Sequence, residues 1–212
     1  MAVSERAIIE SVRARADFAP AVSLGRGALI VVPTYNEREN IAALVGRIVA
    51  QLPECRVLIM DDNSPDGTGR IADDLADADS RVGVVHRPAK NGLGKAYLAG
   101  FREALASQAD FVFEMDADFS HDPAYLPTFL AMIQRADLVI GSRYVAGGGV
   151  TKWGVHRRLI SGAGNAFARV VLGLPVRDAT AGFRCYRRDV LEAIDLDSIH
   201  SEGYAFQIEM VH

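Results

Sequence analysis

Three aspartates lie close together in the stretch FEMDADFSHDP, which ends at Pro123. Asp116 and Asp118 are separated by one residue, and Asp122 follows shortly after them. Carboxylates this close repel one another, whereas Mg²⁺ in proteins is commonly held by one or two carboxylates together with substrate phosphates. The pair therefore predicts a divalent cation that is bound with a phosphorylated ligand. The alternative is that Asp118 only caps a helix that begins near Pro123.

Polar residues also follow the apolar runs elsewhere in the chain. The motif PTYNE contains Tyr35, whose ring can stack on a base, and Glu37, whose carboxylate can accept hydrogen bonds from a sugar or a base. Asp62 ends the run RVLIMDD, where acidic residues of nucleotide-binding folds meet a ribose. Arg143, which follows DLVIGS, is placed to meet a phosphate. These residues indicate a nucleotide site, unless those of PTYNE merely begin the next helix.

The apolar runs alternate with stretches of helical spacing from residue 28 onward. We expect strands at 28–33, 56–62, 81–87, 110–116 and 137–144, and helices at 39–52, 68–78, 93–107 and 123–134. Strands that are apolar without alternation are typical of a parallel sheet covered on both faces, so the fold class is α/β, doubly wound. Ligands bind beyond the carboxyl ends of such strands, and we expect the polar motifs to meet there in one site.

Length and composition predict one domain. The chain has 212 residues, of which 50% are hydrophobic, enough for one sizeable core. We interpret residues 1–27 as an N-terminal extension and residues 28–212 as the domain. No apolar run approaches the roughly 20 residues that cross a bilayer, and the N-terminus lacks the apolar centre of a secretory signal, so we expect a cytoplasmic protein. Cys55 and Cys185 form no pattern typical of a zinc site or a disulfide framework.

The charge is distributed unevenly along the chain. The formal net charge of −4 argues against nucleic acid as a partner. However, the interval between Asp137 and Asp178 contains no acid and several basic residues, so it could bind phosphate or an anionic membrane, or form a solvated face. Within it, HRRLISGAGNAFARVVLGL has an apolar face that suits either a membrane interface or the core, while Arg157 and Ser161 share another face.

Eight motifs together resemble the dolichol-phosphate mannose synthases, inverting glycosyltransferases of family 2 with the GT-A fold. The motifs are PTYNE, DDNSPDGT, GLGKAY, MDADFSHDP, GSRY, RRLISGAGN, DATAGFRCYRR and EGYAFQIEM. The resemblance implies transfer of mannose from GDP-mannose to a polyprenyl monophosphate by a peripheral enzyme on the cytoplasmic face of a membrane, with a possible membrane-protein partner. Family members continue for some tens of residues beyond the last motif, so we expect the domain to be truncated at its C-terminus.

The resemblance also implies roles for individual residues. Those that match the guanosine pocket are Pro33, Tyr35, Glu37, Met60 and Asp62. Those that match the metal and donor-diphosphate site are Asp116, Ala117, Asp118 and, with a shorter side chain than the glutamine of some relatives, Ser120. Those that match the acceptor-phosphate site are Arg143, Arg157 and Ser161. Asp116, Asp118 and Arg143 are the expected catalytic residues, Arg143 contacts the donor as well, and the cofactor is Mg²⁺ or Mn²⁺.

The implied acceptor explains why no general base stands out in these motifs. A phosphate monoester has a second pKa of about 6, so at neutral pH it is mostly ionised and already a nucleophile. An acceptor hydroxyl would instead need a base. Two alternatives stay open: a related transferase that uses UDP-glucose or another donor, and a noncatalytic module that binds nucleotide sugars.

Overall fold

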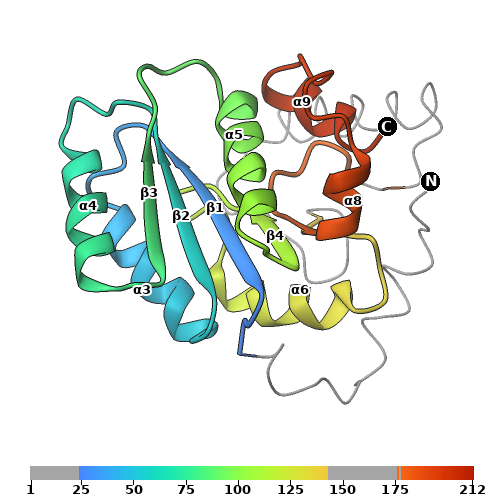
Figure 1. Ribbon diagram of the computed structural model, residues 1–212, viewed down its shortest axis with the longest axis horizontal. Helices are drawn as coiled ribbons and strands as arrows, with labels where there is room; N and C mark the ends of the chain where they lie inside the picture. The colour runs from blue at the N-terminus through green and yellow to red at the C-terminus, as the bar shows by residue number, and fades with distance from the viewer. Residues whose placement is uncertain (1–23, 143–175, 177) are drawn as a thin grey trace, which may run out of the picture.

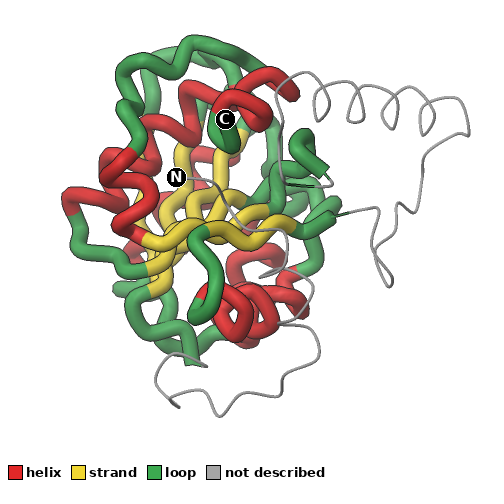
Figure 2. The backbone as a smooth tube through the Cα atoms, turned by 90° about the vertical axis from the view of Figure 1, so that its right-hand side faces the viewer, coloured by secondary structure: helices red, strands yellow, loops and turns green. Residues whose placement is uncertain are grey.

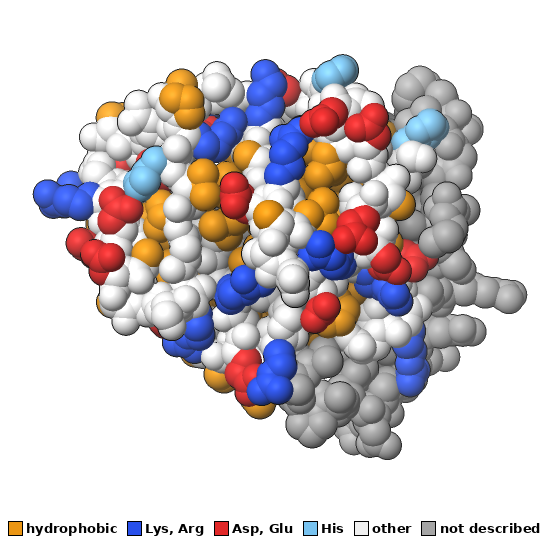
Figure 3. All heavy atoms as spheres, in the orientation of Figure 1, with side chains coloured by type: hydrophobic (Ala, Val, Ile, Leu, Met, Phe, Trp, Pro, Cys, Tyr) orange, Lys and Arg blue, Asp and Glu red, His pale blue; other side chains and the backbone are white. Residues whose placement is uncertain are grey.

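The protein is described by a computed structural model that covers residues 24–142, 176 and 178–212 (Figure 1). Arg143, Arg157 and Ser161, which the resemblance assigns to the acceptor site, lie outside the described residues, as does most of the acid-free interval. On the face seen in Figure 3, basic and acidic side chains of the described residues are interspersed. No helix among the described residues is long and apolar enough to cross a membrane.

A mixed sheet forms the centre of the fold. Its six strands within the described residues have the order β3-β2-β1-β4-β6-β5. They are β1 (Ala28–Thr34), β2 (Arg56–Asp61), β3 (Val82–His86), β4 (Phe111–Glu114), β5 (Leu138–Ile140) and β6 (Arg184–Arg187). The neighbours among β1 to β4 pair in parallel, whereas β6 runs antiparallel to both β4 and β5. The α/β class and the mostly parallel sheet are confirmed.

Helices cover both faces of the sheet (Figures 1 and 2). One face packs against α3 (Ile41–Gln51), α4 (Thr68–Ala78) and α6 (Leu126–Ile133), the last of which follows the short 3-10 helix η1 (Pro123–Tyr125). The other face packs against α5 (Leu93–Ala106), α8 (Arg188–Ala193) and α9 (Gly203–Glu209). The strand termini rather than the faces are therefore where a ligand can reach the sheet.

The central strand β1 explains the unbroken apolar run ALIVVP. All seven of its residues are buried, because β2 and β4 flank it and helices cover both of its faces. Burying each such aliphatic side chain stabilises the fold by about 1.5–3 kcal/mol. Helix α5 lies close to this strand at Gly100, where an added Cβ would come within 2.4 Å of Val31 Cγ1. This close approach places the buried face of α5 directly over the sheet.

Among the strands of the described residues, β6 is the one that the apolar runs did not predict. Its sequence, RCYR, begins and ends with arginine, which is rare inside a sheet. Arg184 is nevertheless fully buried, because its guanidinium donates to the carbonyl oxygens of Ala179 and Ala181, both at 2.7 Å. The backbone of a neighbouring segment thus supplies the polar partners that make an arginine possible in this strand.

Candidate active site

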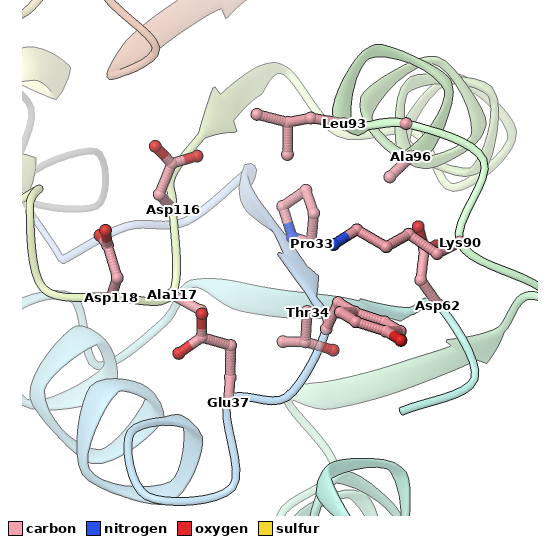
Figure 4. A pocket seen from close by; sticks show the side chains of 12 residues that line it. Pro33, Thr34, Glu37, Asp62, Lys90, Leu93, Ala96, Asp116, Ala117 and Asp118 are labelled. Atoms are coloured by element: carbon pink, nitrogen blue, oxygen red, sulfur yellow. The ribbon is translucent and has the colours of Figure 1, made fainter. Parts of the chain in front are cut away.

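A cavity of about 280 Å³ lies at the carboxyl ends of β1, β2 and β4 (Figure 4). The sequence-predicted residues that line it are Pro33, Tyr35, Glu37, Asp62, Asp116, Ala117 and Asp118. They come from three strand ends that are far apart in sequence and adjacent in the sheet. The geometry thus brings most of the expected donor-site residues around one cavity.

Two expected residues occupy different places. Met60 is fully buried in the core, under the end of β2, and does not line the cavity. Ser120 does not line it either, but its backbone N–H donates to Asp118 Oδ1 at 2.9 Å. Ser120 therefore contacts one expected metal ligand and holds its carboxylate in place.

Asp116 is held on two sides where the chain leaves β4. The Tyr97 hydroxyl donates to Asp116 Oδ1 at 2.8 Å, and the Asp116 backbone N–H donates to His121 Nδ1 at 3.0 Å. The His121 ring stacks on Phe183, with centroids 5.0 Å apart and an interplanar angle of 12°. His121 thus supports the backbone of a site residue.

The next two aspartates have separate tasks. Burial acts to raise the pKa of Asp118, but hydrogen bonds from Ser120 outweigh it and hold that pKa below its usual value. Asp122, rather than Asp118, is the N-cap of η1, and its Oδ1 accepts from the backbone N–H of Ala124 at 3.0 Å. The alternative in which Asp118 serves only as a helix cap is therefore wrong, and Asp118 stays available to a ligand.

The two carboxylates of Asp116 and Asp118 suit a hard divalent cation. Both line the cavity and both offer oxygen atoms, which Mg²⁺ and Mn²⁺ prefer. No group of three or more His, Cys, Asp or Glu side chains in the described part of the chain could hold a metal alone. A cation here would take its remaining ligands from donor phosphates and water, as Mg²⁺ usually does in phosphate-dependent enzymes.

Two adjacent aspartates at the end of β2 differ in their surroundings. Asp61 is buried, and its carboxylate accepts from the hydroxyls of Ser64 at 2.6 Å and Thr34 at 3.1 Å, so it fixes the loops that leave β1 and β2. Asp62 lines the cavity and forms an ion pair with Arg87, whose Nη1 is 2.5 Å from Asp62 Oδ1. Burial raises the pKa of Asp62, and the charge of Arg87 opposes this effect.

Lys90 is a cavity residue that sequence reasoning missed. Its Nζ lies 4.0 Å from the centroid of the Tyr35 ring, within the range of a cation–π contact. In Figure 4 its side chain extends toward Pro33. Lys90 belongs to the loop after β3 and lies shortly before the family motif GLGKAY, so its position in the sequence was the available signal. Thr34, Gly92, Leu93 and Ala96 complete the lining.

A buried polar cluster lies behind the cavity. Glu114 is fully buried at the end of β4, where it accepts from the Tyr186 hydroxyl at 2.8 Å and from Gln207 Nε2 at 2.7 Å. Burial raises the pKa of Glu114 to about 7, although the nearby charge of Arg184 opposes it. We call Glu114, Arg184, Tyr186 and Gln207 the inner cluster. It links β4, β6 and α9 and does not line the cavity.

Comparison with known proteins identifies the family. The model of the family "Glycosyl transferase family 2" matches residues 29–195. The chain belongs to glycosyltransferase family 2. It is 52% identical over 182 residues to the undecaprenyl-phosphate mannosyltransferase of Micrococcus luteus, covering 86% of this chain and 75% of that protein. It is 50% identical over 184 residues to the polyprenol monophosphomannose synthase of Mycolicibacterium smegmatis, covering 86% of this chain and 69% of that one.

Solved structures of other glycosyltransferases share the fold at low sequence identity. Glucosyl-3-phosphoglycerate synthase from Mycobacterium tuberculosis, solved with UDP, aligns with a TM-score of 0.64 and 21% identity, over 93% of this chain and 69% of that one. The mannosyltransferase PcManGT from Pyrobaculum calidifontis, solved with GDP-Man and Mn²⁺, aligns with a TM-score of 0.55 and 19% identity, over 88% of this chain and 51% of that one. The GT-A fold expected for this family 2 member is confirmed.

Proposed function

We propose that this glycosyltransferase transfers mannose from GDP-mannose to a polyprenyl monophosphate, with inversion and with a divalent cation, at the cytoplasmic face of a membrane. The observation that carries the proposal is the shared cavity, which is lined by Asp116 and Asp118 together with Tyr35 and Asp62. Two relatives of about 50% identity whose names specify lipid-phosphate mannosyl transfer support the choice of substrates.

The nucleotide would lie at the ends of β1 and β2. The Tyr35 ring offers a stacking surface, and the carboxylates of Glu37 and Asp62 can accept hydrogen bonds from guanine N–H groups or ribose hydroxyls. Arg87 holds Asp62 in one orientation through their ion pair. The base and the ribose would therefore meet groups of which Asp62 is already ordered by the chain's own contacts.

The diphosphate would lie beside Asp116 and Asp118. A cation held there would neutralise the negative charge that develops on the leaving GDP. Lys90 brings a further positive charge into the same cavity. The chain's own contribution is to fix two carboxylates just beyond the end of β4 and to hold the donor with its anomeric carbon accessible.

The acceptor would need positioning rather than deprotonation. No histidine lines the described cavity, and an ionised phosphate monoester is itself a nucleophile at neutral pH. We propose that Arg143, Arg157 and Ser161 hold this phosphate, with Arg143 also contacting the donor. Their side-chain types suit the task, since arginine pairs well with phosphate and serine can donate a hydrogen bond.

Transfer of radiolabel from GDP-[¹⁴C]mannose to a defined polyprenyl phosphate tests this function directly. We expect label in the lipid fraction with Mg²⁺ or Mn²⁺ and none with EDTA. UDP-[¹⁴C]glucose is the matched donor control and should give little lipid label. Tight binding of GDP without any transfer would instead favour the noncatalytic module, and preferred use of UDP-glucose would overturn the donor assignment.

The acceptor site needs a separate variant. We expect Arg157→Ala to raise the KM for polyprenyl phosphate while leaving the Kd for GDP nearly unchanged, because the two ligands would meet different residues. Steady-state kinetics and calorimetric GDP binding on the same preparation check this. Equal loss of both would mean that Arg157 supports the fold or the donor site.

A further inference from the structure

We propose that Tyr97 is a positioning residue for the metal-binding carboxylate of Asp116. The inference rests on the proposed function, because it concerns the cation that Asp116 and Asp118 would hold. The Tyr97 hydroxyl donates to Asp116 Oδ1 at 2.8 Å, and this contact joins the last residue of the sequence motif GLGKAY to the aspartate pair.

The position of the Tyr97 hydroxyl is fixed by packing. Tyr97 is fully buried, and its ring lies against Phe101 and Phe206, with centroid distances of 6.2 and 6.3 Å. The close approach of α5 to β1 at Gly100 brings the helix near enough for this contact. A side chain with so little freedom can direct a carboxylate that is itself partly exposed.

The hydrogen bond constrains how Asp116 can meet a cation. Oδ1 accepts a hydrogen bond from the Tyr97 hydroxyl, so Oδ2, which lies 3.7 Å from His121 Nε2, is the oxygen that this contact leaves to a cation. The backbone of Asp116 is restrained independently, through its N–H bond to His121 Nδ1 at 3.0 Å. One carboxylate oxygen is thus anchored to α5 while the residue's main chain is anchored to the following loop, which orients the carboxylate before any ligand arrives.

A purely structural explanation exists, since every buried hydroxyl needs a partner. Tyr186 provides the matched case for separating the two explanations. It is also fully buried, and its hydroxyl also donates to a carboxylate at 2.8 Å, but that carboxylate belongs to Glu114, which does not line the cavity. Removing either hydroxyl deletes the same chemical group from the same face of the sheet.

The test compares Tyr97→Phe with Tyr186→Phe in the full chain. Electron paramagnetic resonance titration gives the Kd for Mn²⁺ in the presence of GDP, and calorimetry gives the Kd for GDP in EDTA. For Tyr97→Phe we expect the Mn²⁺ Kd to rise about tenfold, the effect of losing a group that orients a ligand, with metal-free GDP binding within about twofold of wild type. Tyr186→Phe should leave the Mn²⁺ Kd within about twofold.

The outcomes separate this proposal from the function on which it rests. An Mn²⁺ Kd that is unchanged in Tyr97→Phe, or raised equally by both variants, overturns the positioning role alone. A wild-type chain that binds no Mn²⁺ with GDP overturns the cation site and this role together. If Tyr97→Phe does not fold, Phe206→Leu loosens the Tyr97 ring but keeps its hydroxyl, and an Mn²⁺ Kd unchanged in that variant overturns the proposal too.

Discussion

Two neighbouring groups of polar side chains at the same edge of the sheet have opposite environments. The cavity group, which includes Asp62, Lys90, Asp116 and Asp118, faces a space that a ligand can enter. The inner cluster is buried, and its polar atoms other than Gln207 Oε1 bond to one another and to backbone carbonyls. Glu114 and Asp116 are only two residues apart, yet they belong to different groups. What a carboxylate does here is therefore decided by what surrounds it rather than by its place in the motif.

The difference implies different costs of mutation. A side chain that faces the cavity has unused hydrogen-bonding capacity, so replacing it should alter ligand binding more than stability. A member of the inner cluster leaves a buried partner unsatisfied when it is replaced, which costs stability. Three substitutions can establish or contradict this contrast, and a fourth, at a surface histidine outside both groups, sets the scale of a small effect.

Asp118→Asn should produce the largest effect. The amide keeps the shape of the side chain but lacks the charge that would hold the cation, so we expect kcat for mannosyl transfer to fall about 10²–10³-fold. We expect Tm to change by less than about 2 °C, because Asp118 is exposed at the strand exit. Undiminished turnover would contradict the metal assignment. A large fall in Tm would instead indicate that Asp118, like the inner cluster, stabilises the fold.

Arg184→Met should lower stability most. It removes the donors to two carbonyl oxygens and the positive charge beside buried Glu114, so we expect the free energy of unfolding to fall by about 3–5 kcal/mol in urea titrations. Arg187→Met is the matched control at the other end of β6, where the exposed ion pair with Asp189 should contribute about 0–1 kcal/mol. Equal losses of unfolding free energy in the two variants would contradict the proposed contrast.

Lys90→Met should have a moderate effect that is confined to binding. The variant removes a positive charge from a cavity proposed to hold a diphosphate, together with a cation–π contact, so we expect the Kd for GDP to rise about fivefold. Lys95→Met is the control, since Lys95 pairs with Glu202 at 3.6 Å and does not line the cavity. Calorimetry on both variants checks the expectation, which fails if the two variants bind GDP alike.

His86→Gln should have the smallest effect, and that effect should depend on pH. The hydrogen bond to Asp73 raises the pKa of His86 in the folded protein, so protonated His86 stabilises the folded state. This stabilisation is fully present below the ordinary histidine pKa of about 6.5 and is lost as pH rises through the folded-state pKa. We expect the Tm difference from wild type to be at most about 2 °C at pH 5.5 and to vanish by pH 8.5. Asp73→Asn should show the same trend, and a pH-independent difference would exclude this cause.

The sequence predicted the parallel half of the fold better than the antiparallel half. Unbroken apolar runs located β1 to β5, and the motifs led to a family that the comparisons confirm. The sequence did not predict strand β6, because the partners of Arg184 are backbone carbonyls that no side-chain pattern reveals. The contacts of Lys90 and Arg87 were not predicted for a related reason, since their partners Tyr35 and Asp62 follow other strands. The roles assigned to individual site residues stay predictions.

The insertion of β6 beside β4 has a consequence for the order of folding. Glu114 pairs with Arg184 in the antiparallel ladder, so β4 gains its second neighbour only when the chain has been synthesised for a further seventy residues. Until then, a nascent chain exposes one edge of β4 and leaves Glu114 without the partners that make its burial tolerable. We therefore expect β4 and the aspartates that follow it to reach their final order late during synthesis, after the nucleotide half of the sheet has its pairings.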